Sequence, residues 1–225
     1  KNTVIAEAAH MEFSRINPNS PSVPGFIWRT ITRDNLATLV ELAGKCYLVD
    51  GGLSFLFDAE NLRADSIPPA PGAARGAFDQ EKRLVACTTV HIDAKSNKKH
   101  TRIVGLVWPD LRNKGIGTYL IQWSQLQAQS LLARTISDRW EMQIATESHT
   151  EPADRLYQAH GFEQVFETLV LRRDLHLPLP DRALPPDVTL ANWQPKLAVQ
   201  FYQSYHASFQ ERLGFPGWRV AEWIA

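Results

Sequence analysis

The residues best suited to chemistry lie in one turn, where Gly115 and Gly117 alternate with larger residues in the segment R-N-K-G-I-G-T, residues 112–118. The turn follows a β-branched run that ends at Pro109 and precedes apolar residues at helical spacing. Glycines here let the main chain approach a ligand closely, and the first N–H groups of a helix point outward at the positive end of its dipole. The pattern therefore predicts a pyrophosphate-binding turn, with a tight turn that only aids packing as the alternative.

Other familiar site patterns are missing from the sequence. The turn has no third glycine with an acidic partner, as in a Rossmann fingerprint, and no G-x-x-x-x-G-K-[ST] of a P-loop. The seven histidines form no H-E-x-x-H and no short-spaced cluster with Cys or carboxylates, and no G-x-S-x-G elbow occurs. The sequence therefore predicts neither a bound metal nor a serine-hydrolase nucleophile.

A second motif, A-D-R-L-Y-Q-A-H-G-F, occupies residues 153–162 and places Tyr157 40 residues after Gly117. The pattern R-x-x-G-x-G between a strand and a helix, then a strand, then A-x-x-L-Y-x-x-x-G-F, resembles the GNAT superfamily of acetyl-CoA-dependent N-acetyltransferases. The resemblance covers roughly residues 25–174. It implies an α/β fold whose mixed central sheet is splayed, with acetyl-CoA wedged into the opening.

The resemblance also implies which residues hold the cofactor. Main-chain amides of the turn would cradle the pyrophosphate, and the strand before it would lie along pantetheine, with one of its amides polarising the acetyl carbonyl. At Thr150 the family often has Asn, and Thr can still hydrogen-bond there or cap the helix. The expected acetyl-CoA-binding residues are Leu106, Val107, Trp108, Arg112, Asn113, Lys114, Gly115, Ile116, Gly117, Thr118 and Thr150.

Two catalytic roles follow from the same resemblance. Tyr157 matches the tyrosine that protonates the departing CoA thiolate, with a helix aromatic packed on the sheet as its structural alternative. The base that deprotonates the amine is assigned first to Glu147, at the end of the strand beside the cleft. His149, His91 and Asp93 are rivals, and each of the four also has an ordinary role in a strand end, loop or turn.

These motifs need a particular series of elements to position them. Helical or alternating spacing of apolar residues, and the positions of Pro and Gly, set the boundaries. The expected order is a strand at 26–31, a helix at 35–48, an irregular surface excursion at 64–80, hairpin strands at 84–92 and 101–108, a helix at 116–133, a strand at 140–145, a helix at 153–160 and a strand at 162–171.

The chain is expected to hold one domain and part of another. Residues 1–24 form an N-terminal tail, 25–175 the acetyltransferase domain and 176–186 a Pro-rich linker. Aligning Pro24 with Pro186 pairs PGFIWRTIT with PPDVTLANW, a weak repeat of a strand followed by an apolar helix. Residues 187–225 thus resemble the start of a second domain, as in tandem GNAT proteins of the mycothiol-synthase type, or a tail that docks on the first domain or another copy of the chain.

Composition narrows the class of partners and the compartment. The 225 residues include 24 basic and 24 acidic side chains, so no net charge favours nucleic acid or a membrane surface. Cys46 and Cys87 lie far apart and favour a reducing compartment, the cytoplasm. Residues 1–10 lack the apolar stretch of a signal peptide, and a first residue other than Met predicts a piece of a longer chain.

The sequence therefore predicts an N-acetyltransferase in which a small-molecule or peptide amine attacks acetyl-CoA directly. One alternative is a domain that binds acetyl-CoA without transferring the acetyl group and supports a partner domain. Another is an interaction module of a larger synthase that contacts its neighbours through residues 187–225.

Overall fold

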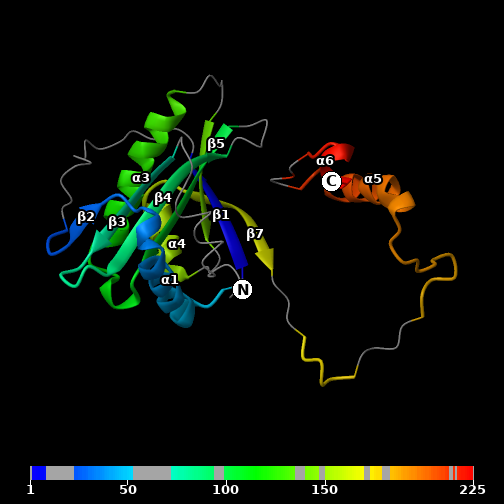
Figure 1. Cartoon of the computed structure of the whole chain (residues 1–225), viewed down its shortest axis with the longest axis horizontal. Helices are drawn as coiled ribbons and strands as arrows, with labels where there is room; N and C mark the ends of the chain where they lie inside the picture. The colour runs from blue at the N-terminus through cyan, green and yellow to red at the C-terminus, as the bar shows by residue number, and fades with distance from the viewer. Residues whose placement is uncertain are drawn as a thin grey trace. The chain divides into compact units, whose positions relative to one another are not determined.

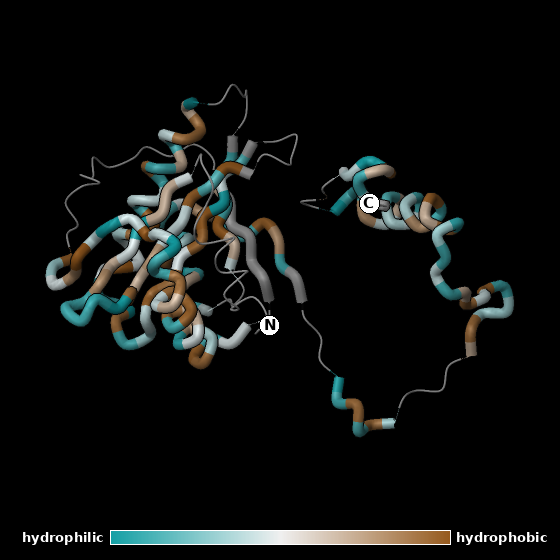
Figure 2. Tube along the Cα trace, in the orientation of Figure 1, coloured by the Kyte–Doolittle hydropathy of each residue, from teal (hydrophilic) through white to brown (hydrophobic). Residues whose placement is uncertain are grey.

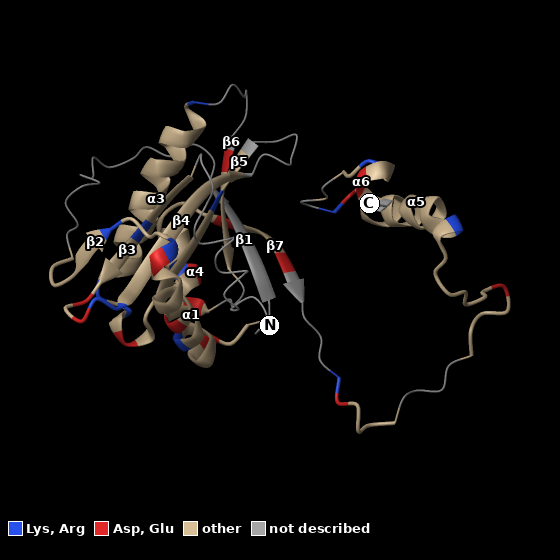
Figure 3. Ribbon diagram, viewed as in Figure 1, with Lys and Arg blue, Asp and Glu red and all other residues tan. Residues whose placement is uncertain are grey.

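The computed structural model describes residues 2–8, 23–52, 72–93, 99–134, 140–146, 150–169, 173–178, 183–212, 215 and 217–224. The chain divides into two compact units, residues 1–170 and residues 171–225 (Figure 1). No helix in the described ranges is long and apolar enough to cross a membrane. Lys and Arg are interspersed with Asp and Glu along the described elements (Figure 3).

A seven-stranded mixed sheet forms the first unit, with the order β2-β3-β4-β5-β6-β1-β7. All neighbouring strands are antiparallel except β5 and β6, which are parallel. This architecture confirms the predicted mixed α/β class. The strands are β1 (Asn2–Ala8), β2 (Ile27–Arg29), β3 (Gly72–Phe78), β4 (Leu84–Asp93), β5 (Lys99–Val107), β6 (Trp140–Thr146) and β7 (Glu163–Leu169).

The parallel pair β5–β6 opens part of the way along its length. Its register runs from Lys99 opposite Trp140 to Ile103 opposite Ile144 and stops there, although β5 continues to Val107. β4 continues to pair with β5 as far as Val107, so the outer part of β5 keeps a ladder on one edge only. The sheet is therefore splayed between β5 and β6.

Two helices cover opposite faces of the sheet beside this opening. α3 (Ile116–Leu132) packs on one face and α1 (Leu36–Asp50) on the other, because successive strand residues such as Ala86 and Cys87 belong to the α3-side and α1-side apolar clusters respectively. The third helix, α4 (Glu151–Ala159), ends where Gly161 adopts the left-handed φ of +77°. Brown apolar residues alternate with teal polar ones along these elements in Figure 2.

Most predicted elements occur, and their ends differ from the predicted ones by two residues at most. The hairpin of β4 and β5, the long helix α3, the alternating strand β6 and the short helix α4 are confirmed. Between β4 and β5, residues 94–98 lie outside the described residues.

The prediction of an irregular excursion at residues 64–80 is wrong for residues 72–78, which form β3. Its Gly and Ala residues are there because the space beside β3 is already filled. A Cβ added to Gly76 would lie 2.5 Å from Leu84 Cδ1 and 3.0 Å from Ile31 Cγ1. Composition alone favours a loop, but packing between β2 and β4 decides the strand.

The N-terminal residues differ from the predicted tail, because Asn2–Ala8 forms β1 inside the sheet. β1 lies between β6 and β7 and is antiparallel to both. At Ala145 and Thr146, where β6 has left β5, β1 is the strand that still pairs with it. β1 therefore supports the outer wall of the opening.

The second unit contains η4 (Pro195–Leu197), α5 (Ala198–Phe209) and α6 (Val220–Ile224). The strand expected after Pro186 is absent from the described residues 187–194. Aromatic side chains gather between the two helices: the ring of Tyr205 lies 5.6 Å from that of Trp223 and 6.3 Å from that of Trp218, and Tyr202 Oη donates to the Trp218 carbonyl at 2.8 Å. Large apolar side chains remain exposed, among them Leu190 (79%) and Trp193 (55%).

Candidate active site

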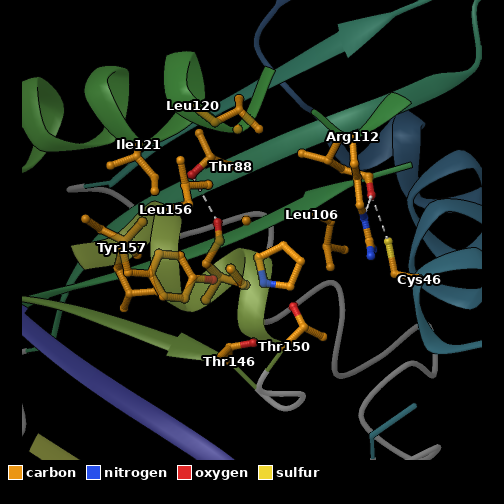
Figure 4. Close-up of a pocket in the computed structure, with 18 of the residues that line it drawn as sticks. Cys46, Thr88, Leu106, Arg112, Leu120, Ile121, Thr146, Thr150, Leu156 and Tyr157 are labelled. Carbon is orange, nitrogen blue, oxygen red and sulfur yellow. Dashed lines mark hydrogen bonds between the residues drawn. The ribbon is translucent and has the colours of Figure 1, made fainter. Parts of the chain in front are cut away.

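A cavity of about 490 Å³ occupies the opening between β5 and β6. This is within the usual range for a small-molecule or cofactor site. Its walls come from α1, β5, the turn before α3, α3, β6 and α4, and in Figure 4 Arg112 and Cys46 lie toward one end and Tyr157 toward the other. The predicted site residues that line it are Leu106, Val107, Arg112, Asn113, Gly117, Thr150 and Tyr157.

One wall is the free edge of β5. The N–H of Trp108 donates to the carbonyl of Val85 on β4 at 2.9 Å. Because alternate residues of a strand direct their main-chain polar groups to opposite edges, Val107 and Gly105 direct theirs toward the cavity. The Val107 carbonyl accepts from Arg112 Nε at 3.2 Å and from Cys46 Sγ at 3.4 Å, which places it on that edge. The edge can therefore pair with an extended, amide-containing ligand.

The turn before α3 ends the cavity with open main-chain donors. Gly115 is the N-cap of α3 at a φ of +82°, and the first main-chain bond of the helix runs from the Tyr119 N–H to the Gly115 carbonyl at 3.0 Å. Among the described residues, no hydrogen bond is made by the main-chain N–H groups of residues 113–118. These groups sit at the positive end of the α3 dipole, so the turn is suited to an anion.

Gly117 brings the start of α3 close to α4. A Cβ at this position would lie 2.9 Å from Leu156 Cδ2, and both residues line the cavity. A larger side chain at position 117 would have to displace Leu156 or occupy part of the cavity that both residues line.

The remaining predicted cofactor residues do not line the cavity with their side chains. The Lys114 ammonium donates to the Asp110 carbonyl at 3.0 Å, and Ile116 is 1% exposed in the α3-side core. Trp108 packs against both apolar clusters, and its N–H is already bonded to β4. Gly115 and Thr118 are also outside the lining, so Arg112, Asn113 and Gly117 are the described residues of the turn that reach the cavity.

Arg112 is held by partners that the motif did not predict. Its Nη1 and Nη2 donate to Oδ1 and Oδ2 of Asp50, the last residue of α1, each at 2.7 Å. The hydrogen bond to Asp50 raises the pKa of Arg112 above its usual value. Burial raises the pKa of the Cys46 thiol, which the Arg112 charge partly offsets, so Cys46 is a protonated donor and not a nucleophile at neutral pH. No local pattern marks Asp50 or Cys46, because 62 residues separate Asp50 from Arg112.

Tyr157 stands on α4 with its ring in the cavity. Burial raises the pKa of its phenol, and the hydrogen bond with the Thr146 side chain only partly opposes this. The phenol therefore remains protonated at physiological pH and can act as a proton donor.

The structure describes two of the four candidates for the base. Glu147 and His149 lie outside the described residues, while Thr146, which precedes Glu147, lines the cavity. His91 lies on β4 in register with Arg102 of β5 and is not among the described residues that line the cavity, and Asp93 lies on β4 in register with His100. In the described ranges, no three His, Cys, Asp or Glu residues are grouped so that they could hold a metal ion.

Comparisons with known proteins agree with this geometry. Residues 77–164 match the family model of the acetyltransferase (GNAT) domain. The mycothiol acetyltransferase of Acidothermus cellulolyticus is 29% identical over 117 residues, which are 52% of this chain and 32% of that protein. The crystal structure of a GCN5-related N-acetyltransferase from Sphaerobacter thermophilus matches with a TM-score of 0.65 and 21% identity, over 89% of this chain and 62% of that one. The chain thus spans about a third of the length of the first protein and less than two thirds of the second.

Proposed function

We propose that the chain is an acetyltransferase of the GNAT family, whose domain model matches residues 77–164, and that it binds acetyl-CoA and transfers the acetyl group directly to an amine. The observation that carries the proposal is the free edge of β5, which leads to a turn of open main-chain N–H groups. A ligand that joins an extended amide chain to a pyrophosphate fits both features at once.

The residues present fit this cofactor. The main-chain N–H groups of residues 113–118 would hold the pyrophosphate, and the main chain of Gly105 and Val107 would pair with the pantetheine amides. Thr150 and Leu156 would contact the pantetheine arm from the α4 side. When bound, acetyl-CoA supplies an activated thioester.

Three groups are assigned the chemical roles: one main-chain N–H and two side chains. A main-chain N–H on the free edge of β5 would donate to the thioester carbonyl oxygen, a contact that contributes roughly 3 kcal/mol in comparable acyl-transfer sites. Tyr157 holds a proton at its phenol oxygen and would deliver it to the departing sulfur. Glu147 is proposed as the base that takes the proton of the amine, because the residue before it lines the cavity.

The proposal is tested in two steps on the purified chain. Calorimetry with CoA and acetyl-CoA measures whether the cofactor binds, and release of free thiol in the presence of a panel of small-molecule and peptide amines measures transfer. Binding followed by amine-dependent thiol release supports the enzyme. Binding without release identifies a cofactor-binding domain that does not catalyse, and absence of both contradicts the proposal.

Two glycine variants sharpen the binding step. Gly115→Ala and Gly25→Ala each place a side chain on left-handed backbone, at φ of +82° and +88°, and no described atom lies within 4 Å of a Cβ at Gly25. Both should lose roughly 1 kcal/mol or more of stability. Only Gly115→Ala should weaken CoA binding, since only Gly115 shapes the turn before α3; equal CoA affinity in the two variants would contradict the assignment of this turn.

A further inference from the structure

We infer that Asp50 and Arg112 form a clasp between α1 and the turn before α3, and that Arg112 acts on the pantetheine arm of the cofactor and not on its pyrophosphate. The inference rests on the proposed function, because it concerns the same cavity. It differs from the expectation drawn from the motif, in which Arg112 belongs to the pyrophosphate cradle.

The first argument is the geometry of the guanidinium. Two of its nitrogens make a fork with the Asp50 carboxylate at 2.7 Å, and its Nε donates to the Val107 carbonyl at 3.2 Å. Such a two-pronged charged pair is strongly directional, so it fixes the plane of the group. The side chains are only 31% and 16% exposed, so water screens this pair less than a surface pair.

The second argument concerns charge. Asp50 lines the same cavity as Arg112 and neutralises it at contact distance. The guanidinium therefore offers little net positive charge to a pyrophosphate. The main-chain N–H groups of residues 113–118 and the α3 dipole remain as the donors for that group.

The third argument concerns the edge of β5. The Val107 carbonyl receives hydrogen bonds from Arg112 Nε and Cys46 Sγ, and a carbonyl oxygen has two lone pairs. These two donors use both, so the ligand must pair with the other edge groups, the N–H of Val107 and the main chain of Gly105. By holding the Val107 carbonyl, Arg112 decides which edge groups receive the pantetheine arm and in which register.

The experiment compares three probes on the full chain: CoA, pantetheine, which lacks the pyrophosphate, and ADP, which has a pyrophosphate but lacks the arm. Affinity for CoA is measured by calorimetry and the other two by competition with CoA. Asp50→Asn, Arg112→Gln and Arg112→Lys should each weaken CoA and pantetheine by about tenfold, the size of a coupling between contacting residues. ADP affinity should not change.

Two comparisons complete the test. The double variant Asp50→Asn/Arg112→Gln should lose no more affinity than either single variant, since both remove one clasp. Asp79→Asn is the control, because it alters the ion pair between Asp79 and Arg83. Neither residue is among the described residues that line the cavity, so the affinities for all three probes should be unchanged.

The opposite pattern overturns the inference. If Arg112→Gln weakens CoA and ADP but spares pantetheine, and Arg112→Lys restores them, Arg112 serves the pyrophosphate as a cation. Equal loss of all three probes shows a general structural role and also overturns the inference. A wild-type chain that binds neither CoA nor pantetheine contradicts the proposed function itself, which separates the two failures.

Discussion

At the scale of single residues, the cavity joins groups whose chemistry depends on burial. Tyr157, Cys46 and Cys87 all have a pKa raised by burial, so each keeps its proton at neutral pH. For Tyr157 this is useful, because a proton donor must be protonated when the sulfur departs. For Cys87, packed among the α1-side apolar residues, it is a property of the core alone.

Tyr157→Phe should lower turnover by roughly 10²-fold to 10⁴-fold, the range expected when a general acid is lost. CoA affinity should change little, since the ring remains in place. Steady-state rates of thiol release and calorimetry of CoA binding measure the two effects separately. Turnover equal to that of the wild type would assign Tyr157 to packing.

Alkaline pH should destabilise the fold through Cys87, because burial raises the pKa of its thiol from an ordinary value of 9.0 to about 12. Between these values the unfolded chain has released the thiol proton and the folded chain has kept it, so the free energy of unfolding falls as pH rises. The slope approaches about 1.4 kcal/mol per pH unit for one such group. Urea unfolding from pH 8 to pH 10.5 measures it.

Cys87→Ala is the comparison for that series. It should be less stable at pH 7, because it leaves a small cavity, but its stability should fall less steeply above pH 9. Parallel curves for the two proteins would show that Cys87 does not titrate in this range.

At the scale of elements, the opening of the sheet depends on strands that hold its two sides apart. β4 pairs with β5 as far as Val107, and β1 pairs with β6 at Ala145 and Thr146 after β6 has left β5. Each wall of the cavity is thus tied to a neighbour on the side away from the cavity. The opening between β5 and β6 therefore arises from the way the strands pair, and not from small side chains along its walls.

Removing residues 1–8 should therefore affect the site as well as the stability. β6 and β7 would lose the strand between them, so the melting temperature should fall, and the wall at Ala145 and Thr146 should become less ordered. CoA affinity should decrease by several-fold or more. Differential scanning fluorimetry and calorimetry measure both, and unchanged values would show that β1 is dispensable for the cavity.

At the scale of the whole molecule, the candidate site lies within the first of the two units. The described residues that line the cavity all belong to residues 1–170, and so do the seven described strands. Residues 171–225 contain α5, α6 and their aromatic cluster, with several large apolar side chains exposed. That residues 187–225 begin a second domain of the same family stays a prediction.

A fragment of residues 1–170 should bind CoA with an affinity within about threefold of the full chain, because it retains every lining residue. Circular dichroism and calorimetry of the fragment test this. A fragment that folds but does not bind CoA would show that residues 171–225 contribute to the site.

Local sequence patterns are enough to predict the elements whose residues carry a regular apolar period or a stop signal. The β4–β5 hairpin, α3 and α4 are examples, because their apolar spacing, turn residues and Gly161 act within a few residues. The glycine turn is predicted the same way, because its pattern is local, and the role of Tyr157 follows from the resemblance of a short motif to the GNAT family.

Tertiary structure alone decided the features that join distant segments. β3 has a loop-like composition and becomes a strand by pairing with β2 and β4, with Leu84 and Ile31 filling the space beside Gly76, and β1 has no local signal that places it between β6 and β7. The partnership of Asp50 with Arg112 arises because α1 ends beside the turn before α3. Because 62 residues separate Asp50 from Arg112, this ion pair produces no periodic pattern in the sequence, and only the folded structure shows it.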